Sequence, residues 1–382
     1  MRRIAAHYAL MPDGHLLENP LITLDDEGTV TAIATIPPSQ LDSSPGVEFH
    51  AGILTPAFVN AHSHLELSYL RGAIAEGCGY AGFAGAMAAV RDRYTAEERL
   101  RAAAEADREM YEGGIGLVGD ISNDDSSFGV KAASPIRYRT FGEVFGLRTD
   151  NFDRISTLGR SLLRSGGDFH LTPHSLYSLN DGLLKRICRE GEDVLSIHFM
   201  ESPAEQQLFE GRGPLSDWYR TTGFECDFLH YGSPAERLVS CVPAERSVML
   251  VHCCCVTQRD IDLIMSHFRA PVYWCLCPRS NAYISGLQPP AGLLRRNGLN
   301  ICTGTDSLAS NRSLSLIGEL KAMADVPADE LLRWATAGGA DALGAAEAGR
   351  IGIGRKCGLV AVSGVDFGRM RLTDNTRARR VA

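Results

Sequence analysis

The sequence predicts an α/β protein: a parallel (β/α)8 barrel of the TIM type with a small β-sandwich domain formed from both chain ends. Eight short apolar runs of strand character alternate with helical stretches along the middle of the chain. Both ends instead consist of short β-like runs broken by turns. Such alternation is typical of parallel sheets, and eight units favour a closed barrel over an open doubly wound sheet. We therefore expect residues 1–52 and 346–382 to build the small domain and residues 53–345 to form the barrel.

The N-terminal part of the small domain is indicated by turn signals at residues 11–14 (Met-Pro-Asp-Gly) and 25–28 (Asp-Asp-Glu-Gly). They separate β-like runs such as residues 21–24 and 30–33. A similar run at residues 358–362 indicates the C-terminal part. The arginine-rich residues beyond it, 369–380, are expected to form a solvated tail.

The barrel is indicated by eight candidate strands. They centre on residues 57–59, 115–118, 137–144, 169–172, 194–197, 248–251, 272–274 and 299–302. Helical stretches separate several of them, for example residues 96–111, which are rich in Ala, Glu and Arg. A length of 382 residues suits an α/β barrel with one small appendage.

Composition excludes several classes of partner. A net charge of −8 argues against a nucleic-acid groove. No apolar run approaches the ~20 residues that a membrane-spanning helix needs, and the two N-terminal arginines precede no signal-peptide core. Eleven cysteines, three of them adjacent at 253–255, favour a reducing cytoplasm without disulfides. We expect a cytoplasmic protein that binds a small-molecule substrate and neither nucleic acid nor membrane; a homodimer is left open.

His62 and His64 directly follow the first expected barrel strand. Two histidines at i and i+2 point the same way on extended backbone, so both rings can reach one metal ion. Polar residues at a strand–loop junction would explain an isolated pair equally well. Three further strand ends decide between the two interpretations, because His198, His252 and Asp306 close the fifth, sixth and eighth strands. Active sites of parallel barrels lie at the C-terminal ends of the strands, so these residues favour a metal site.

Glu201 follows His198 by three residues, which places a carboxylate over the same end of the barrel. A carboxylate beside a metal-bound water is suited to proton transfer. Its alternative role is that of a helix-start acid, since Ser202-Pro203 resembles a helix start. Cys253 to Cys255 could supply soft ligands beside His252, but the run lacks C-x-x-C spacing and packing is favoured.

Together these segments resemble the amidohydrolase superfamily, and specifically its branch of aminohydrolases acting on purine-like rings. The matching segments are residues 55–64, 173–178, 198–201, 251–253, 277–281 and 304–311. The resemblance implies the barrel, the small domain from both chain ends, and one Zn²⁺ per chain, with Fe²⁺ as the alternative. The implied metal ligands are His62, His64, His198 and Asp306, and the implied catalytic residues are Glu201, His252 and Asp306. The bridging lysine of two-metal members is missing; His174 stands in that region, which implies a single metal.

The expected reaction is a hydrolytic deamination. A bound metal lowers the pKa of water towards ~7. Asp306 would orient that water and accept its proton, Glu201 would pass a proton to a ring nitrogen, and His252 would stabilise the oxyanion. A metal-binding barrel without turnover stays open as an alternative.

Residues 60–68 and 304–311 most resemble the deaminases of the futalosine route to menaquinone, whose substrate is 6-amino-6-deoxyfutalosine. Alternatives are S-adenosylhomocysteine or methylthioadenosine deamination, and a chlorohydrolase or aminohydrolase acting on triazine or guanine-type rings. The chain departs from many relatives at residues 79–85, where Phe83 and small residues replace Trp-Leu. The expected substrate contacts are His174, Arg148, Glu66, Phe83 and Asn281. Arg148 suits a carboxylate tail, because guanidinium binds carboxylates bidentately.

Overall fold

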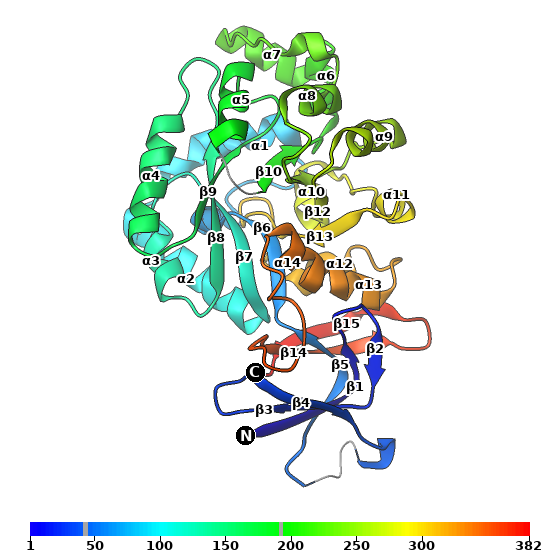
Figure 1. The fold of residues 1–382 in the computed structure, drawn as a ribbon. Coiled ribbons are helices and arrows are strands. Elements are labelled where there is room, and N and C mark those ends of the chain that lie inside the picture. Colours follow the sequence, from blue (N-terminus) through cyan, green and yellow to red (C-terminus); the bar gives the residue numbers. More distant parts are fainter. Residues whose placement is uncertain (41–44, 191–193) are drawn as a thin grey trace.

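A computed structural model describes residues 1–40, 45–190 and 194–382 and shows a helix-covered barrel above a small sheet (Figure 1). The barrel has eight strands: β6 (Phe58–Ser63), β7 (Ile115–Ser122), β8 (Arg137–Val144), β9 (Phe169–Pro173), β10 (Leu195–Phe199), β11 (Val248–His252), β12 (Val272–Leu276) and β13 (Asn300–Thr303). Each expected strand overlaps the observed strand at the same place in the chain. The predicted α/β barrel is therefore confirmed.

Two parallel ladders make up the barrel wall, in the orders β6-β7-β8-β9 and β10-β11-β12-β13. Isolated bridges join them, Ser175 to His198 on one side and Ser63 to Asp306 on the other. Asn60 strengthens the second junction, because its side chain donates to the Thr305 hydroxyl and accepts from the Thr305 N–H. Closure of the barrel thus brings candidate ligands from residues 62 to 306 to one rim.

Helices surround the barrel: α1 (Gly79–Val90), α2 (Ala96–Glu112), α3 (Phe128–Ala133), α4 (Phe152–Arg164), α5 (Asp181–Glu190), α6 (Pro203–Phe209), α7 (Gly213–Thr222), α8 (Pro234–Cys241), α9 (Gln258–His267), α10 (Pro278–Ser285), α11 (Ala291–Arg296), α12 (Leu316–Lys321), α13 (Ala328–Arg333) and α14 (Gly339–Ala342). The α2 helix begins with a capping box between Thr95 and Glu98. Its Ala103, Ala106 and Met110 recur at helical spacing and are buried. None of the described helices combines the length and the apolar character needed to cross a membrane.

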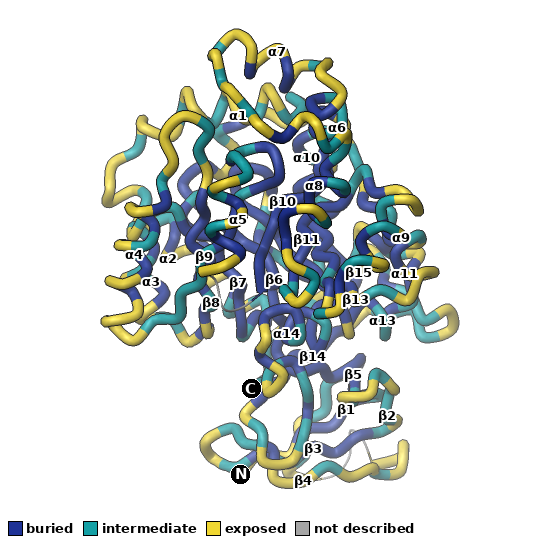
Figure 2. The backbone as a smooth tube through the Cα atoms, turned by 45° about the horizontal axis from the view of Figure 1, so that its top comes forward, coloured by how far each residue is buried: buried dark blue, intermediate teal, exposed yellow. Residues whose placement is uncertain are grey.

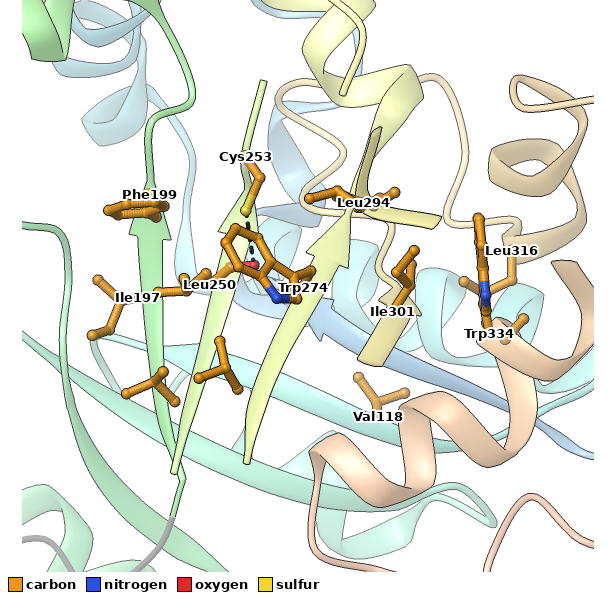
Figure 3. Close-up of a cluster of buried hydrophobic side chains, with 14 of the residues drawn as sticks. Val118, Ile197, Phe199, Leu250, Cys253, Trp274, Leu294, Ile301, Leu316 and Trp334 are labelled. Atoms are coloured by element: carbon orange, nitrogen blue, oxygen red, sulfur yellow. Dashed lines mark hydrogen bonds between the residues drawn. The ribbon is translucent and has the colours of Figure 1, made fainter. Parts of the chain in front are cut away.

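The core lies between the strands and the helices, and the exposed residues form an outer shell (Figure 2). Figure 3 shows Ile197, Leu250 and Trp274 side by side on neighbouring strands. Because parallel barrel strands are covered on both faces, they are apolar along nearly their whole length. Cys253 belongs to this core, with its thiol 3.3 Å from the Leu250 carbonyl oxygen, and all eleven cysteines are free thiols.

The small domain contains β1 (Arg2–Leu10), β2 (Leu16–Glu18), β3 (Pro20–Leu24), β4 (Val30–Thr35), β5 (Glu48–Pro56), β14 (Leu359–Asp366) and β15 (Arg371–Arg380). These strands form one mixed sheet in the order β15-β14-β5-β1-β3-β4, with β2 on β1. Both chain ends contribute, as expected. The sheet is continuous because β1 pairs with β5 on one edge and with β3 on the other.

The expectation of a solvated tail is wrong for residues 371–380, which form β15 and pair with β14. Leu372 and Thr376 on this strand are buried. Arg380 donates to the carbonyl oxygens of Tyr111 and Ile115 and lies over the Tyr111 ring. The arginines misled the interpretation because guanidinium groups can bind backbone carbonyls of neighbouring elements as well as water.

Candidate active site

The five residues expected at the barrel rim lie together in the structure. The His62 ring is centred 4.9 Å from that of His64, 4.9 Å from that of His198 and 5.9 Å from that of His252. Asp306 Oδ1 lies 3.4 Å from His64 Nε2 and 3.8 Å from His62 Nε2. The strand ends therefore bring residues from four different strands to one point.

The nitrogen and oxygen atoms at this point fit a divalent metal. The Nε2 atoms of His62 and His64 face one another at 3.2 Å, and ligand atoms of His62, His64 and His198 lie within 4.8 Å of one another. Burial lowers the pKa of all three histidines, so the rings stay neutral and keep a lone pair. Neutral imidazoles beside a carboxylate are typical zinc ligands. These histidines form a metal site.

His198 is held in the tautomer that a metal ligand needs. Its Nδ1 lies 2.9 Å from the carbonyl oxygen of His174. A carbonyl oxygen only accepts hydrogen bonds, so Nδ1 carries the proton. The lone pair is therefore on Nε2, the atom left for the metal.

Two hydroxyl groups orient Asp306. Its Oδ2 accepts from Ser280 at 2.5 Å and from Ser310 at 2.7 Å, which leaves Oδ1 facing the histidines. Burial acts to raise the pKa of Asp306, but His64, His252 and the two hydroxyls outweigh it and lower that pKa. Asp306 is thus an oriented carboxylate.

The backbone is strained where these strands end. Six non-glycine residues of the described chain adopt positive φ, and four of them, Met200, His252, Cys253 and Asp306, follow or close barrel strands. Each such position costs on the order of 1–3 kcal/mol. Gly304 permits the close approach, because a Cβ there would lie 2.8 Å from His62 Cβ. Strain of this kind concentrates at functional sites.

Glu201 and His252 form a second buried pair beside the ligands. The Glu201 carboxylate lies 3.9 Å from His252 Nε2. The Asn281 amide nitrogen lies 3.0 Å from His252 Nδ1, which makes Nδ1 the acceptor and leaves a proton on Nε2. Burial, with Asp306 and Glu205, raises the pKa of Glu201 well above its usual value. The pair can therefore offer protons inside the barrel rim.

Sequence reasoning missed Glu205. Its carboxylate accepts from the N–H groups of Met200 at 2.9 Å and Glu201 at 2.7 Å. It stands in the first turn of α6, while Glu201 precedes the helix. The helix-start acid is thus Glu205, a role that its position two residues after Pro203 could have indicated.

Only some of the expected substrate contacts lie beside the metal residues. His174 lies at the site, its ring stacked on that of His198 at 4.8 Å and its Nδ1 3.1 Å from the Ser178 hydroxyl. Phe83 is part of α1 and packs in an apolar cluster that includes Tyr69 and Ala309. Asn281 is engaged with His252, as described above.

Glu66 and Arg148 are engaged with backbone groups. Glu66 lies in a 3-10 helix, η2 (Leu65–Leu70), and accepts from the N–H groups of Asn123 and Asp124. Arg148 is exposed, donates to the carbonyl oxygens of Thr222 and Gly223, and lies over the Phe224 ring. The structure does not bring Arg148 to the metal residues.

Two tyrosines at the rim were also missed. The hydroxyl groups of Tyr80 on α1 and Tyr177 are in contact. The Tyr177 ring is centred 6.0 Å from that of His174, and burial raises the pKa of Tyr80 well above its usual value. The segment after β6 therefore reaches across to the segment after β9. Tyr80 and Tyr177 are far apart in the sequence, so no local pattern could have predicted their contact.

Comparison with family models matches residues 53–379 to the amidohydrolase family. The chain belongs to the amidohydrolase family. It is accordingly a hydrolase.

Curated relatives of this amidohydrolase include an adenosine deaminase of Helicobacter pylori, 26% identical over 72% of this chain and 68% of that protein. A 5-methylthioadenosine/S-adenosylhomocysteine deaminase of Halobacterium salinarum is 26% identical over 97% of this chain and 85% of that protein.

Solved structures share the fold. The aminofutalosine deaminase of Helicobacter pylori, in complex with methylthio-coformycin, gives a TM-score of 0.79 at 23% identity and covers 96% of this chain and 93% of its own. A zinc-bound adenosine deaminase of Xanthomonas campestris gives a TM-score of 0.73 at 23% identity and covers 94% of this chain and 84% of its own. The zinc-bound atrazine chlorohydrolase of Arthrobacter aurescens gives a TM-score of 0.74 at 19% identity and covers 94% of this chain and 86% of its own.

Buried Glu319 of α12 binds Arg279 and Asn311 next to this amidohydrolase site and should make stability depend on pH. It accepts from the Arg279 N–H at 2.9 Å and from the Asn311 amide at 2.7 Å. Burial raises its pKa to about 8, against the ordinary 4.5. The folded carboxyl therefore holds its proton more tightly than the unfolded one, so this contribution is complete below about pH 4.5 and is lost towards about pH 8.

The corresponding test compares wild type with Glu319→Gln in denaturant titrations at several pH values. Relative to the variant, wild type should lose on the order of a few kcal/mol of unfolding free energy across that window. Parallel pH profiles of the two proteins would contradict the assignment.

Proposed function

We propose that this amidohydrolase is a metal-dependent deaminase that releases ammonia from the 6-amino group of an adenine-type nucleoside. The observation that carries the proposal is the Glu201–His252 pair beside the metal residues. A purely structural zinc site is closed by four ligands and needs no proton carriers. The deaminase names of the curated relatives support the same reaction.

His62, His64, His198 and Asp306 would hold one zinc ion, with iron as the alternative. The metal supplies Lewis-acid polarisation and a hydroxide-like water near neutral pH. Asp306, fixed by Ser280 and Ser310, takes the proton of the attacking water. Glu201, kept protonated by its surroundings, donates to a ring nitrogen and makes the adjacent carbon electrophilic.

His252 stabilises the developing charge. Its Nε2 proton, fixed by Asn281, is a hydrogen-bond donor aimed into the site. The amine then leaves as ammonia after it receives the proton held by Asp306. As the C=O bond forms, the hydroxyl proton on the attacked carbon returns to Glu201. Thus the chain's own residues account for each proton movement.

For the substrate itself we propose 6-amino-6-deoxyfutalosine, a nucleoside with a benzoate tail. The similarity in fold to the Helicobacter pylori aminofutalosine deaminase supports this choice. Methylthioadenosine, S-adenosylhomocysteine, triazine and guanine-type rings are the competing substrates. A metal-binding barrel without turnover would release ammonia from none of them.

Ammonia release from a panel of these compounds tests the proposal. The tailed nucleoside should react faster than adenosine, because a carboxylate can replace the Thr222 and Gly223 carbonyls as acceptor for Arg148. Arg148→Ala should lower only the rate on the tailed nucleoside, by roughly ten- to a hundred-fold. Equal rates on tailed and untailed nucleosides would remove this substrate and leave the deaminase proposal standing.

A further inference from the structure

Behind His198, two buried carboxylates and a partly buried asparagine form a line across neighbouring strand ends. Glu143 is the last residue but one of β8, Asn123 follows β7, and Glu66 follows β6. The Asn123 amide donates to Glu66 at 3.2 Å and to Glu143 at 3.0 Å. Glu66 is fixed in turn by the N–H groups of Asn123 at 2.8 Å and Asp124 at 3.2 Å.

The line ends on a metal-site histidine. Glu143 Oε1 lies 3.4 Å from His198 Nδ1, the nitrogen that carries the proton. This oxygen is buried and has no hydrogen-bond partner. Because the Nδ1 proton is donated to the His174 carbonyl, Glu143 acts on the ring through its charge. A carboxylate at the N–H edge of an imidazole favours the ring orientation that keeps this edge towards it and increases electron density on the opposite nitrogen. Glu143 therefore acts on the atom that faces the metal.

Two buried carboxylates are costly unless a positive charge is near. Glu66 and Glu143 are 5% and 3% exposed. In the described part of the chain neither makes an ion pair with a lysine or arginine; Lys131 is engaged with Asp120 instead. A purely structural contact could be made with neutral amides at lower cost. A divalent cation held by the adjacent histidines would offset both negative charges.

We propose that Glu66, Asn123 and Glu143 are positioning residues that orient His198 and strengthen its hold on the metal. The proposal rests on the metal-dependent function proposed above. It gives Glu66 a place behind a ligand rather than against the substrate. The proposal also makes Glu143 a neighbour of the metal site and not a metal ligand. Candidate ligand atoms of Glu143, His174 and His198 lie within 4.8 Å of one another, but His198 Nδ1, the nitrogen nearest Glu143, already donates to the His174 carbonyl and cannot bind a metal.

The test is the dissociation constant for Zn²⁺, measured by competition with a chromogenic chelator on purified protein. Glu143→Gln keeps the shape of the side chain but removes its charge, and should weaken Zn²⁺ binding about 10–100-fold. Glu66→Gln should weaken it less, since its charge acts through Asn123. The double variant should be non-additive if the residues act as one unit.

Asp107→Asn is the matched control. Asp107 is a buried carboxylate that accepts from Ser134 and Tyr138, both at 2.6 Å, away from the rim. This variant can lose stability but should keep the wild-type Zn²⁺ dissociation constant.

Each outcome decides between distinct interpretations. An unchanged dissociation constant in both glutamine variants would overturn the inference. Metal stoichiometry that falls from two to one in Glu143→Gln would make Glu143 a ligand of a second ion. A raised KM of Glu66→Gln with unchanged Zn²⁺ binding would indicate that Glu66 contacts the substrate. Wild type that binds no metal would refute the proposed function itself, whereas metal-bound wild type with unaffected variants refutes only this inference.

Discussion

Replacing His62 or Asp306 by alanine is expected to remove the metal and the activity together. Each residue supplies one of four converging groups, and the remaining three cannot fix the ion in the buried site. Protein purified without chelators should contain about one zinc or iron per chain, and either variant should contain close to none. Metal analysis and ammonia release, measured on the same samples, check the result.

His15→Ala provides the control for that experiment, because His15 is an exposed histidine paired with Asp13 in the small domain. It should retain metal and activity. If both ligand variants kept their full metal content, the assigned ligand set would be wrong.

Glu201→Gln should keep the metal and lose on the order of 10²–10⁴ in kcat, the usual worth of a positioned acid or base. The amide has the same shape but cannot give up or accept the proton that the reaction moves. The measurement is kcat together with metal content. Because Glu201 precedes α6, and Glu205 anchors the turn, the fold should tolerate the change.

Glu210→Gln, at the exposed end of α6, is the matched control and should turn over normally. Normal turnover of Glu201→Gln itself would reduce Glu201 to a structural residue at the start of the helix.

The barrel could be predicted from sequence because its strands are covered on both faces. Runs such as residues 248–251 are then apolar without interruption, and the first polar residue, His252, marks the rim. His198 and Asp306 were located from the ends of their predicted strands, although polar residues such as Ser196 and Thr303 interrupt those runs. Once the ends of the strands are predicted, the residues of the metal site can be predicted as well.

Residues whose role depends on distant contacts could not be predicted. Glu143 lies near the end of an expected strand, yet only barrel closure places it against His198. Arg148 follows the same strand, but its guanidinium binds the end of α7, more than seventy residues away in sequence. Asn281 was expected at the substrate, and its additional contact with His252 Nδ1 appears only in the folded structure. Such assignments require the packing of loops, which local patterns do not encode.

The parallel pairing of β1 with β5 and the antiparallel pairing of β14 with β5 have a consequence for biosynthesis. On the ribosome, residues 48–56 emerge some three hundred residues before their second neighbour, residues 359–366. Throughout that interval one edge of β5 offers unpaired N–H and C=O groups to any other strand in reach. The barrel can close first, and the small sheet is sealed last, when the final strands are translated.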